Sequence, residues 1–282
     1  MKTVSQSSHT KINYESRFKK HIETFFKEKK IHEISLDELT QFRTYLLNNM
    51  KSQNSAKSVF NLLELLYDHA NIYFKQDNLI KRVPTIKKVK AKNGYIPLEE
   101  FYQRVDNMKD DVYKRIVIFQ VNTALRVGES LALKWRDIDF TNRTLTINKI
   151  ITSDNKLEYR VKTDESEGVF PYSDIVHELL ITMYEQAKQE HKHFTDDYFI
   201  FGGIKHHYSD QVYSRFKKVF PEITVHDLRH SFATHLAKQK VDIRIVKELM
   251  RHSSISTTIN QYTHVYDEDR REALSSFNMY QK

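Results

Sequence analysis

The chain of 282 residues contains no cysteine, only five glycines and four prolines, and a single tryptophan. The absence of cysteine excludes disulfide bonds and thiolate metal sites, and it agrees with a reducing cytoplasm. Five glycines leave no glycine-rich loop of the kind that cradles nucleotide phosphates. No apolar run reaches the roughly 18 residues of a membrane span, and the polar, basic start MKTVSQSSHTK lacks the apolar core of a signal peptide. We therefore expect a soluble, cytoplasmic protein with no membrane partner.

The net charge of +8 is unevenly distributed along the chain. Residues 1–95 contain 18 Lys and Arg against 9 Asp and Glu, whereas residues 96–282 contain 27 against 28. A basic excess of this kind attracts a polyanion such as nucleic acid, although it is also typical of a solvated surface. With 39% hydrophobic residues, the chain is long enough for two domains with real cores.

The segment RVPTIKKVKAKNGYIP at 82–97 combines two prolines, a glycine and four lysines, and it predicts an interdomain linker at 86–96. Before it, residues 1–85 show apolar spacing typical of a small helical bundle, with a capping-box pattern at Ser35 and Glu38. After it, residues 97–282 are mainly helical, and the alternating stretches TLTINKI at 144–150 and LEYRV at 157–161 indicate a short antiparallel sheet. The expected fold class is therefore mainly α with a small antiparallel β-sheet, in two domains. The helices are expected at the following residues: 98–108, 111–124, 174–190, 209–219, 226–239, 242–250, a short piece around Tyr262, and 268–277.

Candidate functional residues concentrate in three segments: TALRVGESLALKWRDID at 123–139, HDLRHSFATHLA at 226–237 and RHSSISTTINQYTH at 251–264. Arg126 and Arg229 supply planar guanidiniums that match phosphate oxygens. His226 and His252 can donate hydrogen bonds or carry protons. Tyr262 is a candidate covalent nucleophile. This set is suited to holding and attacking a phosphodiester.

Attack on a DNA phosphodiester requires neutralisation of the nonbridging oxygens, activation of a hydroxyl nucleophile and protonation of the leaving 5′ oxygen. A free tyrosine has a pKa near 10, so nearby cations or a base must favour the phenolate. Arg126 and Arg229 supply that field, His226 is the expected general base or proton shuttle, and His252 is the expected second donor to the phosphate. Attack by tyrosine would exchange the DNA phosphodiester for a phosphotyrosyl one, so bond energy is retained. Neither ATP nor a metal ion is then chemically required, and we expect no cofactor.

Together these motifs resemble the tyrosine recombinase family, also called the phage integrase family. The family pattern has an arginine in a T-x-L-R-x-x-E segment, an H-x-x-R segment, a later histidine or tryptophan, and a tyrosine near the C-terminus. In this chain the corresponding residues are Arg126, His226 with Arg229, His252 and Tyr262, and the resemblance covers about the last two-thirds of the sequence. Glu129 then orients Arg126.

The resemblance also implies a leaving-group acid, a lysine on a sheet turn. Lys162 is the best candidate because it follows the strand pattern LEYRV and stands in the dipeptide KT, and Lys156 is the alternative. Two features depart from relatives. The acidic stretch DESEG at 164–168 follows Lys162, and Arg251 stands where relatives usually carry glycine, as either a phosphate contact or a helix cap.

The implied function is site-specific DNA recombination through a 3′-phosphotyrosyl intermediate, which integrates or excises a mobile element. The implied partners are double-stranded DNA, other copies of the chain in a homotetramer, and accessory DNA-bending or directionality factors, at the nucleoid of a prokaryotic cell. Residues 1–85 would be the core-DNA-binding domain. The segment 267–282 would dock on a neighbouring copy or fold back on its own domain.

Three other interpretations stay open at this stage. A type IB topoisomerase uses a similar set of residues to relax DNA, and a DNA-binding regulator would need the basic domain without catalysis. The histidine stretches HKH at 191–193 and HHY at 206–208 invite a metal site, but their spacing is not that of a helix-face ligand set, which favours solvated loops.

Overall fold

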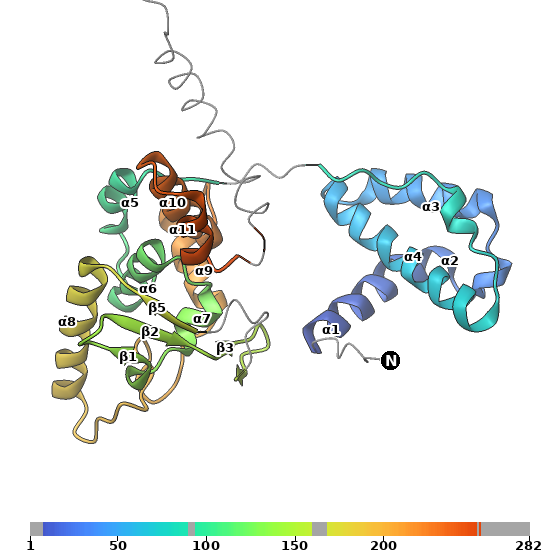
Figure 1. Cartoon of the computed structure of the whole chain (residues 1–282). Helices are drawn as coiled ribbons and strands as arrows, with labels where there is room; N and C mark the ends of the chain where they lie inside the picture. Colours follow the sequence, from blue (N-terminus) through green and yellow to red (C-terminus); the bar gives the residue numbers. More distant parts are fainter. Residues whose placement is uncertain (1–7, 90–93, 160–167, 253, 255–282) are drawn as a thin grey trace, which may run out of the picture. The chain divides into compact units, whose positions relative to one another are not determined.

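The computed structural model describes residues 8–89, 94–159, 168–252 and 254. The chain divides into two compact units, Met1–Lys92 and Asn93–Lys282. Figure 1 shows helices throughout the first unit, and helices around small sheets in the second. The mainly helical fold class with a small antiparallel sheet is therefore confirmed. Within the described residues, no helix combines the length and the apolar character needed to cross a membrane.

The regular secondary structure in the described residues of the N-terminal unit is all helical. Ser35 caps α3 and exchanges hydrogen bonds with Glu38, so the predicted capping box is confirmed. Its core is rich in aromatic side chains, with Phe42, Phe60 and Tyr67 fully buried. The elements are α1 (Ser8–Arg17), the π-helical turn η1 (Phe18–Glu23), α2 (Thr24–Phe26), η2 (Ile31–Glu33), α3 (Leu36–Asn49), α4 (Gln53–Phe74) and η3 (Leu79–Arg82).

The C-terminal unit contains the predicted helices, with bounds close to those expected from apolar spacing. They surround a core that includes Phe101, Phe119, Phe216 and Phe220. The helices are α5 (Leu98–Val105), α6 (Asp111–Thr123), α7 (Val127–Ala132), η4 (Trp135–Asp137), α8 (Asp174–Glu190), α9 (Ser209–Val219), α10 (Val225–Lys238) and α11 (Ile243–Leu249). The helices expected around Tyr262 and at 268–277 lie outside the described residues.

The strands form two small antiparallel sheets instead of one. A three-stranded sheet has the order β1 (Ile138–Asp139), β2 (Thr144–Ile147) and β5 (Gly168–Pro171). A separate hairpin pairs β3 (Ile150–Ile151) with β4 (Leu157–Glu158).

The expected continuous strand 144–150 is therefore wrong, because the chain breaks between β2 and β3. The physical reason is Lys149, which is buried and donates to Asp137 Oδ1 at 2.5 Å and to Asn148 Oδ1 at 3.2 Å. The ion pair holds the Lys149 side chain in the interior. The chain therefore leaves the three-stranded sheet after β2 and enters the hairpin at β3.

The predicted linker 86–96 makes contacts at both of its described ends. On the N-terminal unit, Asn54 on α4 exchanges hydrogen bonds with the main chain of Val89 at 2.8 and 2.9 Å. On the C-terminal unit, the Ile96 amide donates to Ser231 Oγ at 3.0 Å, and Ile96 is buried. Within the described residues, each unit therefore anchors its own end of this segment.

Candidate active site

Arg126 lies at the start of α7 and is held by Glu129 one turn later. Its main-chain amide donates to Glu129 Oε2 at 2.9 Å, and Arg126 Nη1 donates to Glu129 Oε1 at 2.6 Å. The Glu129 side chain is 2% exposed, whereas that of Arg126 is 35% exposed. The carboxylate thus fixes the guanidinium from the protein side and leaves part of it accessible to a substrate.

Helix α10 begins one residue before His226 because Thr224 and Asp227 cap it. The amide and hydroxyl of Thr224 donate to Asp227 Oδ2 at 2.7 and 2.8 Å. The first two turns of α10 therefore carry His226 and Arg229. The predicted H-x-x-R segment is helical, with its two functional side chains separated by one turn.

The Arg229 guanidinium joins two turns of the main chain. Nη1 donates to the Ala124 carbonyl at 2.5 Å, and Nη2 donates to the Met250 carbonyl. Ala124 ends α6 in the left-handed region with φ of 53°, directly before Leu125 and Arg126. These two hydrogen bonds link the segment that precedes Arg126 to the segment that precedes His252. The Arg229 side chain is buried.

The two candidate histidines lie in the field of both arginines. Burial lowers the pKa of His226, and the charges of Arg229 and Arg126 lower it further, against the opposing effect of Asp227. Burial, followed by Arg229 and Arg126, lowers the pKa of His252 to about 4. Both imidazoles are therefore neutral at pH 7, able to accept a proton or to donate one N–H. The structure brings together Arg126, His226, Arg229 and His252.

The backbone of Arg251 caps the C-terminus of α11, which is one of the two places expected for it. Its amide donates to the Glu248 carbonyl at 2.9 Å, and the His252 amide donates to the Lys247 carbonyl at 3.1 Å. The backbone at Arg251 is left-handed, with φ of 50°.

The Arg251 side chain is 1% exposed, and Nη2 donates to the Ala124 carbonyl at 2.9 Å and to Glu129 Oε2 at 3.3 Å. Its guanidinium carbon also lies 5.3 Å from the centre of the Phe170 ring on β5. The Arg251 guanidinium therefore contacts the main chain of Ala124 and the Glu129 carboxylate inside the protein.

The candidates for the leaving-group acid are only partly covered by the structure. Lys156 lies in the turn between β3 and β4, is 71% exposed, and its ammonium pairs with Asp154 Oδ2 at 2.9 Å, a hydrogen bond that raises the pKa of Lys156. Lys162 and Tyr262 lie outside the described residues, as do the acidic residues Asp164, Glu165 and Glu167.

The β3–β4 hairpin packs closely on the helix that begins at Arg126. Gly128 faces it, and a Cβ atom there would lie 2.4 Å from the Ile151 carbonyl oxygen and 2.8 Å from Ile150 Cγ1. A cavity of about 300 Å³ opens beside this contact, lined by Arg126, His226, Thr152, Asn155 and Tyr213, among others. The hairpin is thus one wall of the candidate site.

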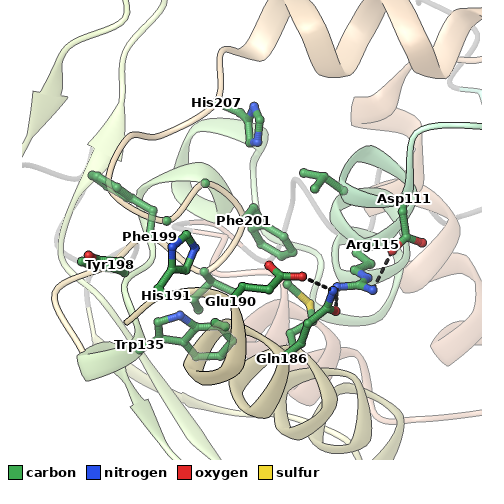
Figure 2. Close-up of a pocket in the computed structure, with 16 residues that line it drawn as sticks. Asp111, Arg115, Trp135, Gln186, Glu190, His191, Tyr198, Phe199, Phe201 and His207 are labelled. Atoms are coloured by element: carbon green, nitrogen blue, oxygen red, sulfur yellow. Dashed lines mark hydrogen bonds and ion pairs between the residues drawn. The ribbon is translucent and has the colours of Figure 1, made fainter. Parts of the chain in front are cut away.

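A second cavity, of about 310 Å³, contains none of the four assembled candidate residues (Figure 2). Its wall includes His191 and His207, one from each histidine stretch of the sequence. Arg115, at the same cavity, donates to Gln186 Oε1 at 2.7 Å and pairs with Asp111 at 2.6 Å. Among the residues that the structure describes, no group of three metal-ligating side chains is present.

Sequence reasoning missed two functional features of this site, the left-handed turn at Ala124 and the buried position of Arg251. A signal was present for Arg251, since an arginine at a position typical of glycine implies that its side chain compensates for the backbone cost. Ala124 carries no such signal, because the hydrogen bond that its carbonyl accepts comes from Arg229, 105 residues later.

Comparison with known proteins decides the family. The profile of the phage integrase family matches residues 97–269, and that of the phage integrase N-terminal SAM-like domain matches residues 1–47. The chain belongs to the phage integrase family. It is therefore a tyrosine recombinase, an enzyme that breaks and rejoins DNA strands at specific sites.

Similar tyrosine recombinases span most of the chain. The ICEBs1 integrase of Bacillus subtilis (strain 168) is 29% identical over 276 residues, which cover 90% of this chain and 73% of the relative. The tyrosine recombinase XerA of Pyrococcus furiosus is 28% identical over 237 residues, covering 77% of this chain and 74% of the relative.

Solved structures share the fold of this tyrosine recombinase. The Tn1549 transposon integrase in complex with transposon right end DNA has a TM-score of 0.75 at 16% identity, covering 98% of this chain and 95% of the other. The lambda integrase dimer bound to a COC′ core site has a TM-score of 0.72 at 17% identity, covering 92% of this chain and 73% of the other.

Proposed function

We propose that this recombinase integrates or excises a mobile element by way of a covalent 3′-phosphotyrosyl intermediate, with Tyr262 as nucleophile. The observation that carries the proposal is geometric. Arg229 ties the turn before Arg126 to the turn before His252, and Arg126 and His226 line one cavity. Names of relatives support the mobile-element role, since they include an ICEBs1 integrase and the transposase from transposon Tn916.

In the proposed reaction the Tyr262 hydroxyl oxygen attacks the scissile phosphorus, and the bond from phosphorus to the 5′ oxygen breaks. The tyrosine proton passes to His226, and the 5′ oxygen takes a proton from Lys162. A partner strand's 5′ hydroxyl then reverses these steps and reseals the DNA. Phosphodiester bond energy is retained in the phosphotyrosyl link, so the reaction needs no ATP and no metal ion.

The charges at the site support these roles. Arg126 and Arg229 would stabilise the phenolate and the charged transition state as fixed donors, which need no reorganisation during the reaction. Neutral His226 has a free lone pair for the tyrosine proton, as a general base requires. Neutral His252 would donate one N–H to a nonbridging oxygen. Glu129 would act on Arg126 alone, as an orienting residue.

Substrate and assembly follow from the same class of enzyme. We propose double-stranded DNA as substrate and a multimer as the active form; lambda integrase has been solved as a tetramer bound to a Holliday junction. The finer proposals are a homotetramer on two duplexes, accessory DNA-bending or directionality factors, and action at the nucleoid of a prokaryotic cell. Residues 1–85 would bind the core site, residues 86–96 would link the domains, and residues 97–282 would carry catalysis.

The test of this function is a nicked suicide substrate, from which the cleaved end diffuses away and traps the covalent adduct. The parent enzyme should form an adduct, and Tyr262→Phe should form none while binding DNA with nearly unchanged affinity, because one hydroxyl is removed. Tyr266→Phe is the matched control and should retain the adduct. If Tyr266→Phe loses the adduct and Tyr262→Phe keeps it, Tyr266 is the nucleophile instead of Tyr262.

The rival functions differ in what they do to DNA. A type IB topoisomerase would relax a single supercoiled plasmid without pairing sites, whereas a recombinase exchanges strands between two sites. A DNA-binding regulator would form no covalent adduct. Sequencing the junctions produced in a host that carries this protein would identify the recombined sites.

A further inference from the structure

The buried carboxylate of Glu129 has two guanidinium partners with different access to solvent. Arg126 Nη1 bonds Oε1 and is partly exposed, whereas Arg251 Nη2 bonds Oε2 and is buried. The same Nη2 of Arg251 reaches the Ala124 carbonyl, which also accepts from Arg229. Arg251 therefore touches both ends of the short segment, 124–129, that carries Arg126.

A carboxylate removed from water is stable only when cations and hydrogen-bond donors satisfy it. If Arg126 were the sole guanidinium at Glu129, its charge would be committed to that carboxylate, in competition with a phosphate. Arg251 supplies a second positive charge that stays inside the protein. Arg126 can then share its guanidinium with substrate while Glu129 stays neutralised.

The position of Arg251 in the chain connects this effect to the next catalytic candidate. Met250, just before it, accepts a hydrogen bond from Arg229, and His252 follows it directly. The left-handed backbone at Arg251 is costly for a residue with a Cβ atom, and the contacts of its guanidinium offset that cost. Arg251 thus seats the segment 250–252 against the segment 124–129.

We propose that Arg251 is a positioning residue for recombination, which neutralises Glu129 so that Arg126 is available to the scissile phosphate, and which couples the seating of His252 to the placement of Arg126. This inference rests on the proposed role of Arg126 in binding phosphate. It assigns no contact between Arg251 and DNA, since the Arg251 side chain is buried and directed at Glu129 and Ala124.

The test is a double-mutant cycle on single-turnover cleavage of the suicide substrate, with R251Q, E129Q and the double variant in the full chain. R251Q leaves Glu129 to be neutralised by Arg126 alone, and we expect cleavage roughly tenfold slower, within the range of coupling in one ion-pair network. Adding E129Q removes the carboxylate that competes for Arg126. The double variant should therefore cleave faster than the product of the two single effects predicts.

A second readout separates this role from structural support. A methylphosphonate at the scissile position has no charge to neutralise, so the ratio of parent to R251Q rates should fall toward one on that substrate. DNA affinity should be nearly unchanged in R251Q. R251K keeps the charge but has no planar fork for two acceptors, and it should restore part of the rate.

Arg104 offers a matched control in the same unit. It pairs with Glu100 at 2.7 Å and Glu222 at 2.6 Å, donates to the Val219 carbonyl at 2.7 Å, and lies over the Phe220 ring. R104Q removes a guanidinium with several partners outside the candidate site, and it should cleave at the parent rate per folded molecule. If R251Q does not fold, R251G gives the same cycle, because glycine favours the left-handed backbone there.

The positioning role would be overturned if the double variant lost cleavage rate by the product of the two single losses. It would also be overturned if the ratio of parent to R251Q rates were unchanged on the methylphosphonate substrate. A parent rate in R251Q would do the same. R126Q distinguishes this failure from failure of the proposed function: if R126Q cleaves normally, the role of Arg126 itself is wrong, whatever Arg251 does.

Discussion

Substituting Gly128 with alanine should displace the β3–β4 hairpin from the helix that begins at Arg126. The added Cβ would lie 2.4 Å from the Ile151 carbonyl oxygen, and real Cβ contacts under 3.0 Å essentially never occur. Because the opposing atom belongs to the main chain, no rotamer change removes the clash. The hairpin must therefore move away from Gly128 by at least about 0.6 Å, a distance on the scale that impairs catalytic geometry.

Two opposing terms set the expected loss of stability. Overpacking of this kind costs about 1–3 kcal/mol, whereas replacing a helical glycine by alanine gains up to about 1 kcal/mol. If the full helix gain is realised, the net loss in the free energy of unfolding should be about 0–2 kcal/mol. Cleavage should fall further than stability implies, by about 10- to 100-fold, because a misplacement near 1 Å at an active site has that effect.

The assay compares urea unfolding with single-turnover cleavage for Gly128→Ala and for a control, Gly202→Ala. A Cβ at Gly202 would lie 2.0 Å from the Lys205 carbonyl oxygen, so it makes the same type of clash at the second cavity. The control should lose stability but keep its cleavage rate per folded molecule. Normal cleavage by Gly128→Ala would refute the reasoning that this contact positions the hairpin for catalysis.

Three further predictions concern protons and salt. Lys162→Ala should slow cleavage by roughly 10²–10⁴-fold, and a 5′-bridging phosphorothioate should restore most of the rate because a thiolate leaves without a proton; no rescue would shift the role to Lys156. Burial holds the pKa of His230 at about 4, so as pH falls the unfolded chain binds a proton near pH 6.5 that the folded chain refuses, and stability should decline by up to about 1.4 kcal/mol per pH unit until about pH 4. His230→Gln should make that decline in urea midpoints shallower by the share of one histidine, while His252, with a pKa also of about 4, still contributes; an unchanged slope would contradict the assignment. Because the basic excess lies in residues 1–95, the fall of log K with log[salt] should be clearly shallower for residues 93–282 than for the full chain, and equal slopes would show that the N-terminal unit makes no net phosphate contacts.

Apolar periodicity and capping residues predicted most of the helical fold. Helix α4, with Val59, Leu62, Leu63 and Leu66 at helical spacing, is one such case, and the Ser35–Glu38 box marked the start of α3. These signals are local, so the sequence near each helix contains them. The strands were harder, because each has two to four residues, and the break at Lys149 depends on an ion pair with Asp137.

The candidate site was predictable where its residues stand in short motifs. The sequence identified Arg126, Glu129, His226, Arg229 and His252, and the structure brings their segments together. It did not reveal that Arg251 reaches Ala124 and Glu129, which are 127 and 122 residues away along the chain. Such contacts depend on the packing of α6 against α7 and α10, and of α10 against α11, which no local pattern encodes.

The central claim, covalent catalysis by Tyr262, is tested most directly by mapping the DNA-linked peptide. The adduct from a suicide substrate would be digested with protease and nuclease, and the modified peptide sequenced by mass spectrometry. Covalent catalysis by Tyr262 predicts one peptide from TTINQYTH, with a 3′-linked nucleotide on Tyr262. A nucleotide on another residue, or one linked through its 5′ phosphate, would contradict it.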